Sequence, residues 1–238
     1  MTLNIVIIEF DVNNFFIKFD SQIFNNMLKI NEIYYSIQGE STKAGFPCVF
    51  VRFTFCNLRC TYCDTEYAFY EGKDLSIGDI IQEVRKYNCN LVELTGGEPL
   101  VQEESLILMK QLADSGFEVL LETGGSLPIN TIDPRVKIIM DLKTPSSGMM
   151  KKNMYENINC LKKEDEVKFV IGSREDYLWS KQIIEKYNLD KKNAILFSVV
   201  SGKLLPVELV NWILDDKLNV RFQLQMHKFI WNPDERGV

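Results

Sequence analysis

Residues 91–122 read LVELTGGEPLVQEESLILMKQLADSGFEVLLE, and the fold class can be predicted from this stretch. The runs 91–95 and 118–122 are apolar enough to be strands buried on both faces. Between them, the pattern over 103–115 predicts an amphipathic helix that ends before Gly116, a residue suited to the position after a helix. A strand, a helix and a second strand in this order predict a βαβ unit with parallel strands.

The same alternation covers nearly the whole chain from Cys48 onward. The further strands are predicted at 48–54, 136–141, 166–171, 194–199 and 219–225. The further helices are predicted at 76–88, 174–187 and 206–215, with a weaker one at 151–162. Neither a G-x-G-x-x-G motif after the first strand nor a P-loop is present. We therefore expect an α/β fold, an incomplete (βα) barrel of about six to seven parallel strands with helices outside.

Residues 1–28 contain no glycine or proline and differ from the rest of the chain. We interpret them as an N-terminal extension to which the sequence assigns no role; an extra strand or an interface segment is the alternative. Residues 29–238 are expected to form a single domain, because no linker or internal repeat interrupts the alternation.

The composition excludes several classes of protein. The chain has 238 residues, of which 46% are apolar, and this apolar content excludes a disordered protein. Its net charge of −6 gives no positive potential that would attract nucleic acid or an anionic membrane. No run approaches the roughly 18 apolar residues of a membrane span, and the N-terminus does not resemble a secretory signal. We expect a cytoplasmic protein, whose thiols stay reduced.

Three of the six cysteines, Cys56, Cys60 and Cys63, fall within eight residues. A structural zinc site needs four protein ligands, and none of the other candidates is suitably spaced. Those candidates are Cys48, Cys89, Cys160 and His227. A 4Fe-4S cluster with three thiolates fits better, because one iron stays open for a non-protein ligand. Zinc remains the alternative at this point.

The spacing C-x-x-x-C-x-x-C, followed by a strand that ends in Gly96-Gly97-Glu98-Pro99, resembles the radical S-adenosylmethionine (SAM) enzymes. Taken alone, the second motif would be an ordinary strand-to-helix turn. The resemblance implies that SAM binds the open iron and is cleaved to a 5′-deoxyadenosyl radical. It also implies that Tyr62 stacks on the adenine.

The stretch NEIYYSIQGE at 31–40, together with Cys63-Asp64-Thr65, is similar to the 7-carboxy-7-deazaguanine synthase family. The resemblance implies a lyase that converts 6-carboxy-5,6,7,8-tetrahydropterin to 7-carboxy-7-deazaguanine with ring contraction and loss of ammonia. This reaction belongs to queuosine biosynthesis, hence to tRNA modification and purine metabolism. The implied cofactors are a 4Fe-4S cluster, SAM and Mg²⁺. The implied partners are the pterin substrate, a flavodoxin-like or ferredoxin-like electron donor and a second copy in a homodimer, with no nucleic acid and no membrane.

The resemblance also assigns site residues, with no catalytic group beyond the cluster and the SAM radical. The metal ligands are Cys56, Cys60 and Cys63 for the cluster and Thr65 for Mg²⁺. The cofactor-binding residues are Tyr62, Cys63, Asp64, Gly96, Gly97, Glu98, Asp141, Leu142, Lys143, Ser146 and Ser198. The substrate-binding residues are Ile37, Gln38, Gly39, Glu40, Arg52, Thr95 and His227.

The residues themselves support the substrate class. Arg52 interrupts an apolar strand, and its planar fork suits a substrate carboxylate, although an internal carboxylate is an alternative partner. Gln38 and Glu40 offer hydrogen-bonding groups that a pterin needs, although Glu40 could be a structural cap. The Thr65 hydroxyl suits Mg²⁺ or a loop cap. His227 suits substrate or a buried structural role.

Three places depart from the family pattern: Ser41 and Phe55 stand where glycine is common, and the stretch FSVVS at 197–201 lacks an expected proline. These departures bear on loop conformation. Two other functions remain open at this point. One is a radical SAM activase that installs a glycyl radical on a protein partner, and the other is a zinc or iron–sulfur module without catalysis.

Overall fold

The described part of the chain folds into one mixed sheet of nine strands. The structure, a computed structural model, describes residues 27–232 and 235–238. The strands are β1 (Met27–Ile37), β2 (Pro47–Phe53), β3 (Lys73–Ser76), β4 (Leu91–Gly96), β5 (Glu118–Thr123), β6 (Lys137–Asp141), β7 (Glu166–Ile171), β8 (Ala194–Val199) and β9 (Arg221–Phe222). Their order is β3-β1-β2-β4-β5-β6-β7-β8-β9, with β3 and β9 at open edges. Because β2 and β4 to β9 run parallel, the expected incomplete barrel is confirmed.

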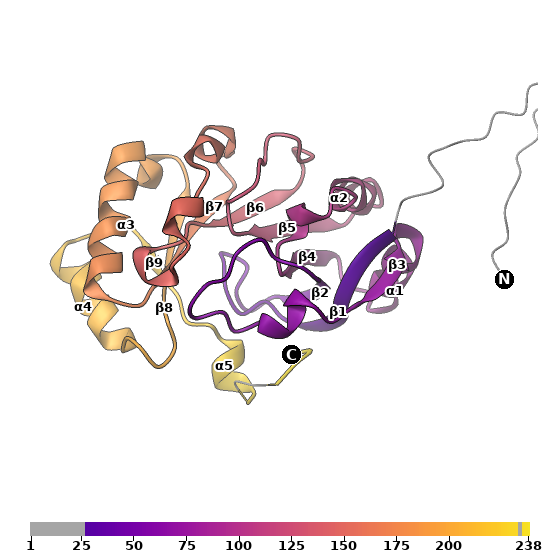
Figure 1. Cartoon of the computed structure of the whole chain (residues 1–238), viewed down its shortest axis with the longest axis horizontal. Helices are drawn as coiled ribbons and strands as arrows, with labels where there is room; N and C mark the ends of the chain where they lie inside the picture. The colour runs from indigo at the N-terminus through magenta and orange to yellow at the C-terminus, as the bar shows by residue number, and fades with distance from the viewer. Residues whose placement is uncertain (1–26, 233–234) are drawn as a thin grey trace, which may run out of the picture.

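The four longer helices connect the parallel strands. They are α1 (Ile77–Lys86), α2 (Ser105–Asp114), α3 (Arg174–Tyr187) and α4 (Pro206–Asp215), and the short α5 (His227–Ile230) follows β9. Ser76 caps α1, because its hydroxyl accepts a hydrogen bond from the Asp79 N–H at 3.1 Å. Figure 1 shows α1 to α4 around the outside of the curved sheet and α5 beside its open side.

The predicted helix over 151–162 is wrong. The segment forms two short 3₁₀ turns, η5 (Met150–Lys152) and η6 (Tyr155–Cys160). Its asparagines bind neighbouring loops: the Asn153 amide donates to Lys143 O at 2.9 Å, and the Asn157 amide donates to Leu127 O at 2.8 Å. Side-chain bonds of this kind compete with regular helix.

Two strands lie outside the predicted alternation. β1 and β3 pair antiparallel at one edge of the sheet, β1 between β3 and β2. At the other edge, the strand predicted over 219–225 is only Arg221–Phe222. Of the predicted extension over 1–28, residues 1–26 lie outside the described residues, and Met27 and Leu28 begin β1.

The two-residue period of the strands divides their side chains between two faces. On the outer face, residues such as Val51 and Leu94 pack with α1 and α2. A second outer cluster joins β6, β7 and β8 to α3 and α4. On the inner face, the apolar residues Phe50, Leu120, Ile139 and Leu196 form a separate small cluster. Polar residues follow them toward the carboxyl ends of the strands, which is where such sheets carry their sites.

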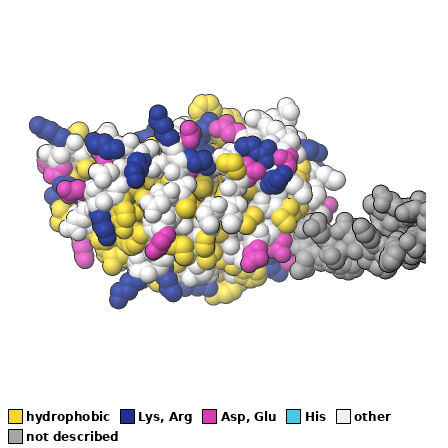
Figure 2. Space-filling view, turned by 90° about the horizontal axis from the view of Figure 1, so that it is seen from above, with side chains coloured by type: hydrophobic (Ala, Val, Ile, Leu, Met, Phe, Trp, Pro, Cys, Tyr) yellow, Lys and Arg dark blue, Asp and Glu magenta, His cyan; other side chains and the backbone are white. Residues whose placement is uncertain are grey.

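On the surface, Lys, Arg, Asp and Glu side chains are interspersed with apolar ones, as Figure 2 shows for one face. Within the described ranges, no helix is both long and apolar enough to cross a bilayer.

Candidate active site

A cavity of about 890 Å³ opens at the carboxyl ends of the parallel strands. The inner face of the sheet, the loop after β1, the cysteine loop after β2 and the C-terminal segment line it. Eighteen of the predicted site residues lie on its wall: Ile37, Gln38, Gly39, Glu40, Arg52, Cys56, Cys60, Tyr62, Cys63, Asp64, Thr65, Thr95, Gly96, Gly97, Glu98, Asp141, Lys143 and His227. The structure therefore brings together residues that are up to 190 positions apart in the chain.

The three clustered cysteines lie together in the loop that leaves β2, and all are free thiols. Burial raises the pKa of Cys60 to about 11 and also raises the pKa of Cys56. The Leu58 N–H already points at the sulfur of Cys56, 3.4 Å away, as it would toward a thiolate ligand. Among the described residues, no three His, Cys, Asp or Glu side chains converge on a single ion. The thiolates of an iron–sulfur cluster need not converge on a single ion, because each of them binds a different iron.

Gly96 and Gly97 position this loop by letting two backbones approach closely. A Cβ on Gly97 would lie 1.9 Å from the Phe55 carbonyl oxygen, and Gly96 has φ +123°. The Gly97 N–H donates to Phe53 O at 3.0 Å, and the Glu98 N–H donates to Phe55 O at 2.8 Å. The glycines thus fix the end of β2 against the end of β4, immediately before the first cysteine.

Glu98 lines the cavity, but its carboxylate is already engaged by the protein. It accepts hydrogen bonds from the Gly124 N–H at 2.7 Å, from the Thr123 hydroxyl at 2.9 Å and from the Leu100 N–H at 3.2 Å. Its side chain is 1% exposed. Glu98 therefore joins the loops after β4 and β5.

Three predicted cofactor residues do not line the cavity. Leu142 follows the inward Asp141 and so points to the opposite face, into the core under α3. The N–H of Ser146 donates to the Asp176 carboxylate at 2.8 Å, and its hydroxyl binds the same group. Ser198 lies on the inner face, 1% exposed, and its hydroxyl has no described partner.

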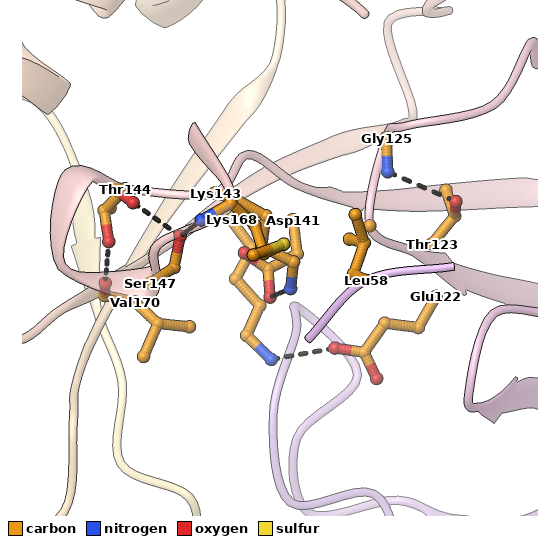
Figure 3. A network of polar contacts seen from close by, with 12 residues as sticks. Leu58, Glu122, Thr123, Gly125, Asp141, Lys143, Thr144, Ser147, Lys168 and Val170 are labelled. Atoms are coloured by element: carbon orange, nitrogen blue, oxygen red, sulfur yellow. Dashed lines mark hydrogen bonds and ion pairs between the residues drawn. The ribbon is translucent and has the colours of Figure 1, made fainter. Parts of the chain in front are cut away.

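Asp141 and Lys143 form an ion pair of 2.7 Å beside the cysteine loop (Figure 3). One carboxylate oxygen of Asp141 accepts from Lys143, and the other is buried without a hydrogen bond from the described part of the chain. A buried acceptor without a partner is costly, and a ligand ammonium group would satisfy it. The amino group of SAM is such a donor, so this pair fits the cofactor.

The Thr65 hydroxyl is free to bind a ligand. Thr65 begins the short turn η2 (Glu66–Phe69), but its side chain makes no capping hydrogen bond. Its only polar neighbour among the described side chains is the sulfur of Cys63, 3.8 Å away. The alternative role as a loop cap is therefore not seen.

Ser41 and Phe55 both adopt the left-handed backbone conformation, with φ of 63° and 73°. Glycine adopts this conformation without strain, whereas other residues adopt it at a cost. The two loops therefore keep the backbone that a glycine would favour, although this chain has other residues there.

The loop after β1, together with Glu93 and Lys168, the strand residues that bind it, forms the floor of the cavity. The Gln38 amide donates to the carboxylate of Glu93 in β4, and its oxygen accepts from the Glu40 N–H at 2.6 Å. The Glu40 carboxylate pairs with Lys168 in β7 at 2.5 Å. The side chains of Gln38 and Glu40, which are predicted to hydrogen-bond the pterin, are thus held by protein partners. Glu40 does not cap a helix.

Arg52 has an internal partner and still faces the cavity. Its Nε donates to Glu32 at 2.7 Å, and its Nη2 donates to the Tyr34 hydroxyl at 2.6 Å. Nη1 has no hydrogen-bond partner among the described residues. An internal carboxylate thus orients the guanidinium, and a contact between its Nη1 and a substrate carboxylate stays a prediction.

The C-terminal segment closes the site. His227 begins α5 above Gly39, and the Met226 N–H donates to Gly39 O at 3.1 Å. Burial lowers the pKa of His227 below its ordinary 6.5. Lys228 donates to Asp64 at 2.8 Å, which ties the segment to the cysteine loop.

Three charged residues in the strands of the cavity were given no site role from the sequence: Glu93, Glu122 and Lys168. They are inward-facing charges in otherwise apolar strands, the same signal that drew attention to Arg52. Lys168 is 5% exposed and donates to Glu122 at 2.8 Å (Figure 3). It also donates to Glu40. Although burial opposes its charge, these carboxylates raise the pKa of Lys168 well above its ordinary value.

Comparison with known proteins identifies the family. Residues 50–188 match the Radical SAM superfamily model. The 7-carboxy-7-deazaguanine synthase of Chlorobaculum tepidum is 48% identical over 214 residues, 89% of this chain and 97% of that protein. The synthase of Clostridium acetobutylicum is 39% identical over 88% of this chain and 99% of that protein.

Among solved structures, QueE from Escherichia coli superposes with a TM-score of 0.70 over 86% of this chain and 98% of that one. At 20% sequence identity, this match supports the fold. The fold, the three-cysteine cavity and the extent of the sequence match lead to one assignment. The chain belongs to the 7-carboxy-7-deazaguanine synthase family of the radical SAM superfamily.

Proposed function

We propose that the chain is a radical SAM lyase that converts 6-carboxy-5,6,7,8-tetrahydropterin to 7-carboxy-7-deazaguanine, a step of queuosine biosynthesis. One observation carries the proposal: a single cavity is lined both by the three cysteines and by a polar floor built from Gln38, Glu40 and Lys168. Relatives of nearly the same length carry the name of this activity. No observation favours a glycyl-radical activase or a non-catalytic module.

Cys56, Cys60 and Cys63 would hold the 4Fe-4S cluster, and Asp141 would bind the amino group of SAM. When bound, the cluster and SAM would supply radical chemistry for abstraction of a hydrogen atom from the substrate carbon that bears the carboxylate. Thr65 would contribute its hydroxyl to Mg²⁺, which prefers oxygen ligands.

The remaining residues bind and orient the substrate. Arg52 would donate to the substrate carboxylate through Nη1, while Glu32 and Tyr34 hold the guanidinium in place. The substrate and the product differ by one molecule of ammonia, so the conversion needs no net oxidant and the removed hydrogen must return. His227, neutral because burial lowers its pKa, lies over the floor and helps to exclude water.

The cellular setting is part of the proposal. The cluster needs an outside one-electron donor of flavodoxin or ferredoxin type, and a cytoplasmic location would keep the three thiols reduced. We also propose a homodimer, and a single catalytic domain over 29–238 preceded by the extension.

The test is anaerobic incubation of the reconstituted, reduced protein with SAM, Mg²⁺ and the carboxytetrahydropterin, followed by mass spectrometry. We expect 7-carboxy-7-deazaguanine together with ammonia. The Cys60→Ala variant should form neither this product nor 5′-deoxyadenosine. The matched control is Cys160→Ala, since Cys160 is an exposed thiol outside the cavity. If 5′-deoxyadenosine forms without the deazaguanine acid, the superfamily stands and the substrate assignment fails.

A further inference from the structure

Three carboxylates lie in the floor region of the cavity, and two of them are saturated. Glu40 accepts from Lys168 at 2.5 Å on one oxygen and from the Gln225 amide at 3.0 Å on the other. Glu122 accepts from Lys168 at 2.8 Å and from the Thr95 hydroxyl at 3.1 Å. Neither group has an oxygen left without a protein donor.

Glu93 differs from both. Its side chain is 2% exposed, and its Oε2 accepts from the Gln38 amide. Its Oε1 receives no hydrogen bond from the residues that the structure describes, although Glu93 lines the cavity. Burial, together with nearby Glu122 and Glu40, raises the pKa of Glu93 well above its ordinary value, so the ionised form with two acceptors needs bound donors to stabilise it. The residue is buried as a whole and lines the cavity, so a ligand that brings donors would stabilise its free oxygen.

The surroundings of Glu93 suit a flat ring. In the sheet register, Glu93 lies beside Phe50 of β2, and Phe50 stacks on Tyr34 with ring centroids 5.0 Å apart. Both aromatic rings line the cavity. The ammonium group of Lys168 has three N–H donors, of which Glu40 and Glu122 take two. An aromatic wall, a carboxylate and one spare donor therefore face the same space.

This arrangement matches one edge of a pterin. The 2-amino-4-oxopyrimidine ring presents two adjacent donors, N3–H and the 2-amino group, and next to them one acceptor, the 4-oxo group. A carboxylate accepts from both donors at once, and an ammonium group donates to the oxo group.

We propose that Glu93 recognises the N3–H and 2-amino donors of the substrate and that Lys168 donates to its 4-oxo group. This inference rests on the proposed function, and it makes Glu93 the residue that selects a 2-amino ring over a 2-oxo ring. A purely structural Glu93 would only hold Gln38 and the loop after β1.

The experiment compares two stable oxidised ligands that differ only at position 2. 6-Carboxypterin carries the amino group, and 6-carboxylumazine carries an oxo group. Equilibrium dialysis is run anaerobically on the reconstituted enzyme with SAM and without reductant, so that no turnover occurs. The wild-type protein should bind 6-carboxypterin at least about tenfold more tightly than 6-carboxylumazine. The 2-oxo group of lumazine is an acceptor, and it would face the acceptor oxygen of Glu93 without a hydrogen bond.

Glu93→Gln replaces one acceptor by a donor at unchanged shape, so the preference should reverse toward 6-carboxylumazine. Glu93→Asp keeps both acceptors and should keep the preference for 6-carboxypterin at weaker affinity. The matched control is Glu122→Gln, which alters a saturated carboxylate and should leave the ratio of the two affinities in favour of 6-carboxypterin. Thermal unfolding and iron content check that each variant is folded and loaded.

An unchanged ratio in Glu93→Gln, or equal loss of both affinities, would overturn the recognition role. Equal binding of both ligands by the wild-type protein would overturn it as well. The product assay separates this failure from that of the proposed function. A reversed preference in a protein that makes no deazaguanine acid would leave the pterin-edge site standing and reject the reaction.

Discussion

Gly39 and His227 lie against each other, although 188 residues separate them: a Cβ on Gly39 would fall 2.9 Å from Nδ1 of His227. The same Cβ would lie 3.2 Å from the His227 backbone nitrogen. The close approach lets the Met226 N–H donate to Gly39 O at 3.1 Å. The floor of the cavity and the C-terminal segment that closes it are therefore one packed unit.

Gly39→Ala should displace α5 from the floor, since the methyl group meets backbone as well as a side chain. We expect a several-fold higher KM for the pterin with a smaller change in 5′-deoxyadenosine formation without substrate. Gly45→Ala is the control in the same loop: its φ is +93°, but nothing lies within 4 Å of the added Cβ. It should lower stability by about 1 kcal/mol and leave KM unchanged.

Gly97→Ala should prevent cluster loading, because its Cβ would lie 1.9 Å from the Phe55 carbonyl oxygen and push the cysteine loop away from β4. Iron content and visible absorbance after anaerobic reconstitution measure the effect. Gly78→Ala is the matched control, since its Cβ meets only the Ser76 hydroxyl at 3.8 Å. In α1 this change should stabilise the protein by about 0.5–1 kcal/mol. Normal iron content in Gly97→Ala would contradict the role of this glycine.

The Phe55→Ala variant of the protein should be less stable than the Phe55→Gly variant. Its φ of 73° costs a residue with a Cβ about 1 kcal/mol relative to glycine. Denaturant unfolding of Phe55→Ala and Phe55→Gly isolates this cost, because both lack the ring. Ile107 is 40% exposed in α2, and there the order should reverse, with glycine about 1 kcal/mol worse than alanine. If the alanine variant were more stable than the glycine variant at position 55 as well as at position 107, the backbone at Phe55 would carry no strain.

Lys168→Met should strongly destabilise the protein, because it leaves Glu40 and Glu122 without their shared cation. Losing one partner of a buried charged set costs about 3–5 kcal/mol, and the partial exposure of the two carboxylates places the cost at the lower end. Adding Glu122→Gln should recover part of this loss, since one uncompensated charge disappears. Additive effects in denaturant unfolding would mean that the two residues do not interact.

His227 should make the folded state less stable in acid. Burial lowers its pKa below the ordinary 6.5, so the unfolded chain binds more protons between the lowered pKa and 6.5. Stability therefore rises with pH across this window and is lost as the pH falls below about 6.5. The free energy of unfolding, compared between the wild type and His227→Gln from about pH 5 to pH 8, should shift in favour of the variant at low pH. A difference that is independent of pH would contradict this.

Much of the candidate site could be predicted from local signals. The cysteine spacing, the motif at 96–99 and the single charge of Arg52 in an apolar strand are visible in a short window of sequence, and the structure places them on one cavity. Glu93 and Lys168 carry the same signal as Arg52. Their meaning depends on neighbours from other strands, because a buried charge is explained only by what lies opposite it.

The strand–helix alternation, the parallel sheet and the three-cysteine loop can all be predicted from the sequence, since periodicity and spacing act over a few residues. Three features are visible only in the folded chain: β1 and β3 add an antiparallel edge, Leu142 turns into the core, and Lys168 binds Glu40. The folded chain also places Gly39 under His227. These are contacts between distant segments, and they depend on the register and curvature of the sheet, which no local pattern encodes.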